Sequence, residues 1–272
     1  MTYTPPHMPA LVVQGKDEPA REPPKPGDPA KFPKPYFATL AHNGLVSTFF
    51  VGGQLSTVQQ MIKAGFVWNW DVRAYDDDRA GTMNSIVANF MATNSTHLVF
   101  VGSHVGFTAN DVVRLLAAKQ DVVAAAPPRC GPGAGVEMRV PDTVQGIGND
   151  LIEVNDVGFD LVCIRKRVFE KLIEAHPEWF YTMPLERRVD GSMHTVVGFF
   201  EGALVDEPFA GRTMRQRMTE TQAFCGAWRA LGGKVHVHMG VEVAKVGQYV
   251  YRASPHTAVE RVGEVTVTEK TG

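Results

Sequence analysis

The stretch STHLVFVGSHVGFTANDVVRLLAAKQDVVAAAPPR, from Ser95 to Arg129, decides the expected fold. It opens with an apolar run at residues 97–101, which is typical of a strand buried on both faces. A helical pattern begins at Asn110 and ends near residue 119, and a second apolar run follows at residues 121–126. A strand, a helix and a strand in succession predict a parallel pair of strands joined by a crossover.

The same alternation continues on both sides of this stretch. We expect helices at residues 56–64, 80–93, 110–119, 167–175 and 220–231, and strands at residues 36–40, 66–73, 97–101, 121–126, 158–164 and 234–238. Ser56 is the expected N-cap of the first helix and Gly65 its end, while residues 205–217 read as a polar loop. The pattern predicts a single three-layer α/β domain with a mostly parallel central sheet covered on both faces.

Composition sets the limits of this domain. Ten of the 18 prolines lie in the first 35 residues, so residues 1–34 are expected to form a disordered arm, followed by a domain at 35–255 and a tail at 256–272. A net charge of −2 argues against binding to nucleic acid by bulk electrostatics alone. The absence of a signal peptide, of a membrane-spanning run and of paired cysteines predicts a cytoplasmic protein with buried free thiols at Cys163 and Cys225.

Polar residues at the ends of the predicted strands indicate where a ligand would bind. In an open parallel sheet, ligands bind beyond the carboxyl ends of the strands. This rule places Thr39, Asp71, Arg73 and the run from Gly102 to His104 around one crevice. The 205–217 loop, with its arginines Arg212, Arg215 and Arg217, could close over that crevice and supply cations for a diphosphate.

Three blocks, at 95–129, 153–178 and 219–247, resemble GT-A glycosyltransferases, especially small bacterial and bacteriophage family-2-like members. The second block is EVNDVGFDLVCIRKRVFEKLIEAHPE and the third is TETQAFCGAWRALGGKVHVHMGVEVAKVG. The resemblance implies a GT-A fold and a nucleotide-sugar donor. The residues that it and the crevice argument assign to the donor are Thr39, Asp71, Arg73, Asn84, Gly102, Ser103, Lys245, Arg212 and Arg215.

The chain departs from the GT-A pattern at the positions that bind the metal ion and at the position that provides the general base. The metal-binding Asp-x-Asp pair of the family falls on Gly102 and His104, and Mg²⁺ or Mn²⁺ suits neither residue well. The acidic pair of the third block falls on Glu220 and Thr221, and the histidine of its final motif falls on Lys245. A divalent metal is therefore doubtful, with His104 as a weak candidate ligand.

These departures leave two interpretations open. In one, the enzyme works without a metal because Lys245 and the loop arginines supply positive charge, with Glu220, Asp160 or His104 as general base. In the other, the domain is a non-catalytic subunit that binds a nucleotide or a partner. The acceptor could be a modified DNA base of a phage, a polysaccharide or a protein, and a transferase of another group is a third possibility.

Several of these residues also have simple structural explanations. Glu220 could be a helix N-terminal carboxylate that the macrodipole favours, with Thr219 as the cap. His236 and His238 point to one face of a strand and have the spacing of a metal pair. Because no third ligand is evident near them, a half-exposed strand face is the preferred interpretation.

Overall fold

The computed structural model describes residues 33–66, 68–74, 78–130, 135–141, 146–147, 150–187, 193–209, 212–247 and 250–252. By its internal contacts the chain divides into two units, Met1–Phe32 and Pro33–Gly272, and all described residues belong to the second unit. The expected arm, apart from residues 33 and 34, and the expected tail lie outside the described residues. The limits of the domain therefore stay a prediction.

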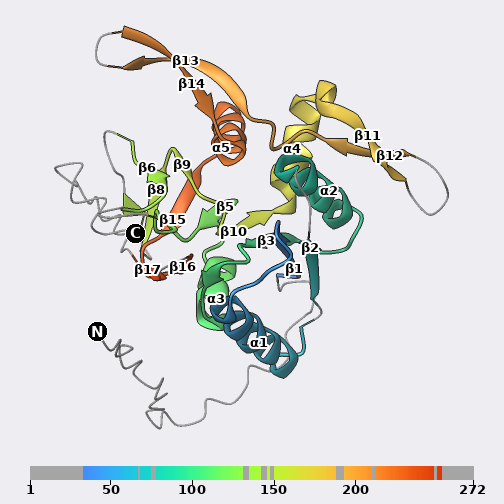
Figure 1. Ribbon diagram of the computed structural model, residues 1–272, viewed down its shortest axis with the longest axis vertical. Coiled ribbons are helices and arrows are strands. Elements are labelled where there is room, and N and C mark those ends of the chain that lie inside the picture. Colours follow the sequence, from blue (N-terminus) through green and yellow to red (C-terminus); the bar gives the residue numbers. More distant parts are fainter. Residues whose placement is uncertain are drawn as a thin grey trace, which may run out of the picture. The chain divides into compact units, whose positions relative to one another are not determined.

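An eight-stranded sheet forms the centre of the second unit (Figure 1). In order across the sheet, its strands are β2 (Asn69–Ala74), β1 (Pro35–Ala41), β3 (His97–Val101), β10 (Leu161–Arg165), β5 (Val122–Ala124), β15 (Val235–His238), β8 (Leu151–Val154) and β7 (Gly146–Ile147). Strands β10 and β8 run antiparallel to both of their neighbours, and the other strands share one direction. The expected mostly parallel sheet is confirmed.

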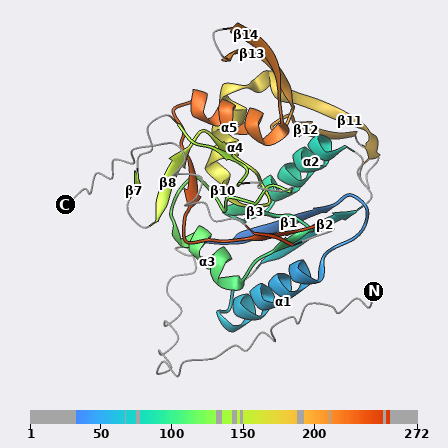
Figure 2. The same cartoon turned by 60° about the vertical axis from the view of Figure 1, so that its left-hand side comes forward.

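Helices cover both faces of this sheet, as Figure 2 shows. They are α1 (Thr48–Lys63), α2 (Arg79–Met91), α3 (Ala109–Ala117), α4 (Lys166–Ala175) and α5 (Glu220–Ala230). Strand β3 shows the two-sided burial: Leu98 and Phe100 pack with α2, α4 and α5, whereas Val99 and Val101 pack with α1 and α3. Two apolar cores on opposite faces of one sheet make the domain the three-layer α/β fold that the sequence predicts.

The first helix begins earlier than the sequence predicts. Ser47, and not Ser56, is the N-cap of α1, and its hydroxyl oxygen accepts a hydrogen bond from the backbone N–H of Phe50 at 3.1 Å. The hydroxyl of Ser56 instead donates to the carbonyl of Gly53 within the helix at 2.9 Å. A Cβ on Gly53 would lie 2.7 Å from the Phe107 ring, so close packing against Phe107 requires glycine inside the helix despite its low helix propensity.

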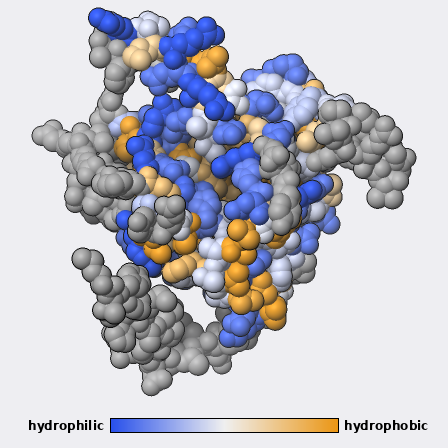
Figure 3. All heavy atoms as spheres, viewed as in Figure 1, coloured by the Kyte–Doolittle hydropathy of each residue, from blue (hydrophilic) through white to orange (hydrophobic). Residues whose placement is uncertain are grey.

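The expected polar loop at 205–217 is wrong, because β13 (Ala203–Phe209) and β14 (Arg212–Met218) pair as an antiparallel hairpin. Figure 1 shows the hairpin projecting from the body of the domain, and Figure 3 shows mostly hydrophilic side chains over it. Every side chain of β14 is at least partly exposed. Because both faces of the hairpin are exposed to solvent, its strands lack the alternation of apolar and polar residues that marks a half-buried strand. A second hairpin joins β11 (Phe180–Arg187) to β12 (Met193–Val197), after the short 3-10 helix η2 (Pro177–Trp179).

Short strands bring the C-terminal part of the domain to the end of β3. Strand β16 (Ala244–Val246) pairs with β17 (Val250–Arg252) and with β4 (Val105–Gly106), so that Lys245 lies opposite Val105. Strand β6 (Met138–Arg139) pairs with β9 (Asp156–Val157) and places Glu137 beside Gly158.

Two further sequence expectations concern cysteines and membranes. Cys163 and Cys225 are buried free thiols, as predicted, and burial raises the pKa of each to about 12. Within the described part of the chain, every helix falls short of the length and apolar character needed to cross a membrane.

Candidate functional site

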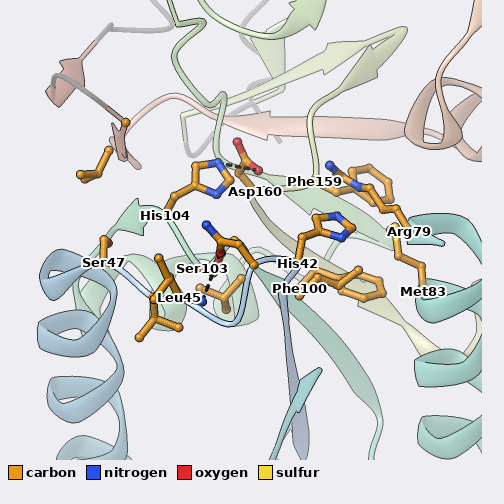
Figure 4. Close-up of a pocket in the computed structure, with 17 residues that line it drawn as sticks. His42, Leu45, Ser47, Arg79, Met83, Phe100, Ser103, His104, Phe159 and Asp160 are labelled. Carbon is orange, nitrogen blue, oxygen red and sulfur yellow. Dashed lines mark hydrogen bonds and ion pairs between the residues drawn. The ribbon is translucent and has the colours of Figure 1, made fainter. Parts of the chain in front are cut away.

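A cavity of about 600 Å³ opens at the carboxyl ends of β1 and β3 (Figure 4). Residues after β1 form one wall, and the start of α2 contributes Arg79 and Met83. The segment after β3 supplies Gly102, Ser103 and His104, and Asp160 comes from the turn before β10. The structure thus brings together four residues that the sequence assigns to the site.

Glycine at position 102 allows two chain segments to approach each other closely. The Gly102 N–H donates a hydrogen bond to the Asp160 carbonyl at 2.7 Å. A Cβ at this position would lie 3.0 Å from Val105 Cγ2 and 3.1 Å from Asp160 Oδ1. The missing side chain therefore leaves room for the Asp160 carboxylate beside the end of β3.

Four ionisable side chains form a cluster at the inner end of the cavity: Glu137, Lys245, Asp160 and His104. The Lys245 ammonium lies 2.9 Å from Asp160 Oδ2 and 2.9 Å from Glu137 Oε1. His104 Nε2 lies 3.7 Å from Asp160 Oδ1, and in Figure 4 the two side chains point toward one another. Asp160 and Lys245, with side chains 9% and 15% exposed, form the buried centre of this charge cluster, whereas His104 is 39% and Glu137 38% exposed. His104 and Asp160 are the two members that line the cavity.

The charge cluster fixes the protonation of its buried members. Burial alone would raise the pKa of the Asp160 carboxyl, but the interaction with His104 and the positive charge of Lys245 lower it to about 2. Burial alone would lower the pKa of Lys245, yet the Asp160 and Glu137 carboxylates raise it above its ordinary value. Both groups are therefore ionised at neutral pH.

The donor set at this position does not fit a divalent cation. Gly102 offers no ligand atom, and the Asp160 and Glu137 carboxylates are both engaged by the Lys245 ammonium. Of this donor set, only the His104 imidazole is not engaged by Lys245, whereas Mg²⁺ and Mn²⁺ prefer several oxygen ligands. Among the residues that the structure describes, no group of three or more His, Cys, Asp or Glu side chains is placed to hold a metal.

Three residues that the sequence assigns to the donor site instead form hydrogen bonds or an ion pair along β1 and β2. Thr39 is fully buried, and its hydroxyl oxygen accepts a hydrogen bond from Trp70 Nε1 at 3.0 Å. Asp71 pairs with Arg73 at 2.8 Å and accepts a hydrogen bond from the Tyr36 hydroxyl at 3.1 Å. None of the three is among the residues that line the cavity.

Asn84 is buried, and its side-chain amide links α2 to β11 and to the residues that follow β12. Its amide donates to the Tyr181 hydroxyl at 3.0 Å and to Glu201 Oε1 at 3.0 Å, and its carbonyl oxygen accepts from the Phe200 N–H at 3.2 Å. These bonds satisfy the amide away from the cavity, because Asn84 does not line it.

A second cavity, of about 580 Å³, adjoins the first. Glu220 and Arg217 line it together with Asp78, Glu201 and Arg79, and Arg79 lines both cavities. Thr219 caps α5, as predicted. Arg212 and Arg215 lie exposed on β14 outside both linings, and Thr221 is buried in the first turn of α5.

Sequence reasoning missed Arg79, His42 and Asn43, which all line the first cavity. Arg79 is the first residue of α2, directly after the N-cap Asp78. The helix start after β2 lies at the same edge of the sheet as the other site segments, so the carboxyl-end rule could have indicated Arg79.

The histidine pair on β15 differs from its expected setting. His236 is only 2% exposed, and His238 is partly buried, because β15 lies inside the sheet between β5 and β8. The expected half-exposed strand face is therefore wrong for His236.

The fold and the cavity define an α/β domain with a crevice at its strand ends. No protein-family model matches the chain, and neither does any curated protein sequence. Among solved structures, A197 from STIV is similar with 9% identity and a TM-score of 0.44, over 88% of this chain and 100% of that one. The inositol-1-phosphate CTP transferase from T. maritima is similar with 10% identity and a TM-score of 0.42, over 85% of this chain and 94% of that one. Both similarities are too weak to indicate a family.

Proposed function

We propose that the protein is a glycosyltransferase that moves a sugar from a nucleotide-sugar donor to a hydroxyl acceptor without a divalent metal. The observation that carries this proposal is the first cavity, which opens at the carboxyl ends of β1 and β3 and combines an apolar floor with cationic and imidazole side chains. Leu40, Phe100 and Phe159 are apolar residues of its lining, and Arg79, His42 and His104 are the basic side chains that line it. Such a cavity suits a nucleoside joined to a diphosphate.

The charge cluster does not itself supply positive charge for an anion, so that charge must come from another side chain. With His104 neutral, Glu137, Asp160 and Lys245 carry a net charge of about −1, and protonation of His104 brings the cluster to neutrality. Lys245 lies outside the cavity lining and is bonded to two carboxylates, so it acts through Asp160 as a positioning residue. Arg79 is the cation with access to the departing diphosphate, which preorganised positive charge would stabilise.

His104 is the best placed general base. Asp160, with a pKa of about 2, holds a proton too weakly to accept one from a hydroxyl at neutral pH. His104 is exposed to the cavity, and the Asp160 carboxylate lies 3.7 Å from its Nε2 and would stabilise the imidazolium. In the proposed step the acceptor oxygen bonds to the anomeric carbon of the sugar, the bond from that carbon to the diphosphate oxygen breaks, and the hydroxyl proton moves to His104.

One observation favours a second candidate function. Lys245 pairs internally with the buried Asp160 carboxylate and with the partly exposed Glu137 carboxylate, an arrangement that stabilises a fold equally well without turnover. A domain of this kind would bind a nucleotide and act as a non-catalytic subunit.

Release of nucleoside diphosphate separates the two candidates. The protein is incubated with UDP-, GDP- and CDP-sugars in EDTA or in Mn²⁺, and nucleotide binding is followed in parallel by thermal shift. The proposal expects release that persists in EDTA and falls about 100-fold or more in His104→Ala, with nucleotide binding retained. His238→Ala is the matched control, because His238 lies outside the cavity lining, and Glu220→Gln tests the rival base.

Each remaining result has a definite meaning. A thermal shift on addition of nucleotide, without release of nucleoside diphosphate from any donor, would contradict the transferase and support the non-catalytic binding subunit. Release that requires Mn²⁺ would contradict the metal-free reaction, and the lack of both release and thermal shift would exclude a nucleotide site altogether.

A further inference from the structure

The second cavity continues into a third one that the proposed reaction does not yet use. The third cavity has a volume of about 570 Å³ and shares Glu201, Gly202 and Ala203 with the second. The second in turn shares Arg79 with the first. The donor cavity is thus the first member of a row of three, which runs past the N-terminus of α5 toward the start of β11.

Aromatic side chains line the third cavity on one side. Trp179, Phe180 and Tyr181 are consecutive along the chain, and Phe180 is 51% exposed. The Trp179 ring stacks on the His176 ring with centroids 4.0 Å apart and an angle of 4° between the planes, which fixes its orientation. A half-exposed phenylalanine beside a fixed indole offers flat apolar faces to a ligand.

Small residues also border this cavity. Gly198 follows β12 and donates a hydrogen bond to the Trp179 carbonyl, Gly202 and Ala203 lie at the start of β13, and Gly226 and Ala227 lie on α5. A Cβ at Gly226 would meet only the Met218 methyl, at 3.6 Å. These small residues add little bulk to the cavity of about 570 Å³ that the aromatic side chains line.

The charge of these two cavities disfavours a polyanion. Their carboxylates are Asp78, Glu178, Glu201 and Glu220, and their cations are Arg79 and Arg217. Both arginines line the second cavity, and the third is lined by Glu178 and Glu201 without any cation among the residues described there. Each phosphate of a nucleic acid needs a nearby positive charge to bind, and a carboxylate-lined cavity repels it.

We propose that the second and third cavities form one acceptor groove, and that the acceptor is a neutral polyhydroxylated chain, an oligosaccharide, and not a nucleic acid. Carboxylate oxygens accept hydrogen bonds from sugar hydroxyls, and aromatic rings pack on the apolar C–H faces of pyranose rings. The acceptor hydroxyl would enter past Arg79, the residue shared with the donor cavity. This inference rests on the proposed transferase function and assigns its acceptor class.

Binding of the acceptor can be measured without catalysis. The full chain is titrated with neutral tetrasaccharides of glucose, galactose, mannose or N-acetylglucosamine, and with an octamer of deoxythymidine, by saturation-transfer NMR at low ionic strength. We expect at least one tetrasaccharide to bind and the oligonucleotide not to bind. Phe180→Ala and Glu178→Gln should each weaken sugar binding about fivefold or more, whereas Leu55→Ala, a similar truncation of an exposed residue on α1, should not.

Nucleotide thermal shifts of the same samples separate this inference from the proposed function. An unchanged nucleotide shift in Phe180→Ala, together with lost sugar binding, supports the acceptor groove. Nucleotide binding without any sugar binding, or sugar binding that Phe180→Ala leaves unchanged, overturns the groove and leaves the donor site intact. Preferential binding of the oligonucleotide, strengthened in Glu178→Gln, also overturns it. If Phe180→Ala loses sugar binding and no sample shows a nucleotide thermal shift, the sugar site stands and the donor assignment is overturned.

Discussion

Replacing Lys245 by methionine should destabilise the domain in a strongly pH-dependent way. The substitution keeps the aliphatic stem and removes the ammonium that lies 2.9 Å from both Asp160 and Glu137. The pKa of Asp160, lowered from 3.8 to about 2, corresponds to about 2 kcal/mol of stability at neutral pH. Removing one partner of a buried ion pair costs about 3 to 5 kcal/mol. Because Glu137 is 38% exposed and water can solvate it, we expect a loss of about 2 to 4 kcal/mol at pH 7.

The sign of the pH dependence follows from the Asp160 carboxyl. In the wild type its folded pKa is below the unfolded value of 3.8, so its contribution is complete above that pH and is lost as the pH falls toward 2. Without Lys245, only the interaction with His104 opposes the effect of burial, so the folded pKa of Asp160 rises and less of the stability gained from its ionisation is left. The difference between Lys245→Met and the wild type should therefore be largest at pH 7 and shrink toward pH 4.

Urea unfolding followed by tryptophan fluorescence at pH 7, 5.5 and 4 measures this difference. The double variant Lys245→Met with Asp160→Asn should recover at least half of the loss at pH 7, since it removes the unpaired charge. Lys63→Met, in the last turn of α1, is the control and should change stability by less than about 0.5 kcal/mol. A loss below that level in Lys245→Met, or an equal loss at pH 7 and pH 4, would refute the reasoning.

Two further predictions concern the packing and the pH response of the domain. Gly53→Ala should destabilise it by about 1 to 3 kcal/mol, because the new Cβ would lie 2.7 Å from Phe107, whereas Gly52→Ala, with nothing within 4 Å, should stabilise it by about 0.5 to 1 kcal/mol in urea unfolding. Similar effects of the two substitutions would contradict the packing argument. Burial and the charge of Arg165 lower the pKa of His97 to about 4, so the unfolded state binds its proton more readily and stability should fall as the pH drops from about 6.5 to about 4. Thermal melts at pH 7 and 5 should show a smaller fall in His97→Gln, and an identical fall would exclude this source.

The helices and strands that pack in the core could be predicted, because burial places apolar residues at the spacing that is typical of a buried helix or strand. Strand β3 is apolar at every position after His97, since both of its faces are covered. The β13–β14 hairpin has both faces in solvent, so its sequence resembles a loop. The start of α1 was misplaced for a different reason: Gly53 is kept by its contact with Phe107, and that contact is invisible along the chain.

The candidate site was predictable where it depends on the sheet and unpredictable where it depends on long-range pairing. Gly102, Ser103 and His104 follow a buried strand, and the carboxyl-end rule places them at the cavity. Lys245 was expected to face the diphosphate, but its ammonium contacts Glu137, which lies 108 residues away in the sequence. Only the pairing of β16 with β4 and of β6 with β9 brings these segments together.

Gly102, Asp160 and Lys245 therefore form one physical unit. The missing side chain at position 102 lets the Asp160 carboxylate lie beside the end of β3, and a carboxylate that is 9% exposed needs a cation nearby. Lys245 supplies that charge from β16, which pairs with β4 just after the end of β3. An aspartate at position 102 alone would begin with a Cβ 3.1 Å from Asp160 Oδ1 and would add a third carboxylate beside one ammonium. A divalent site at this position thus requires that Lys245 be replaced together with Gly102, and making the two changes one at a time should pass through a destabilised variant.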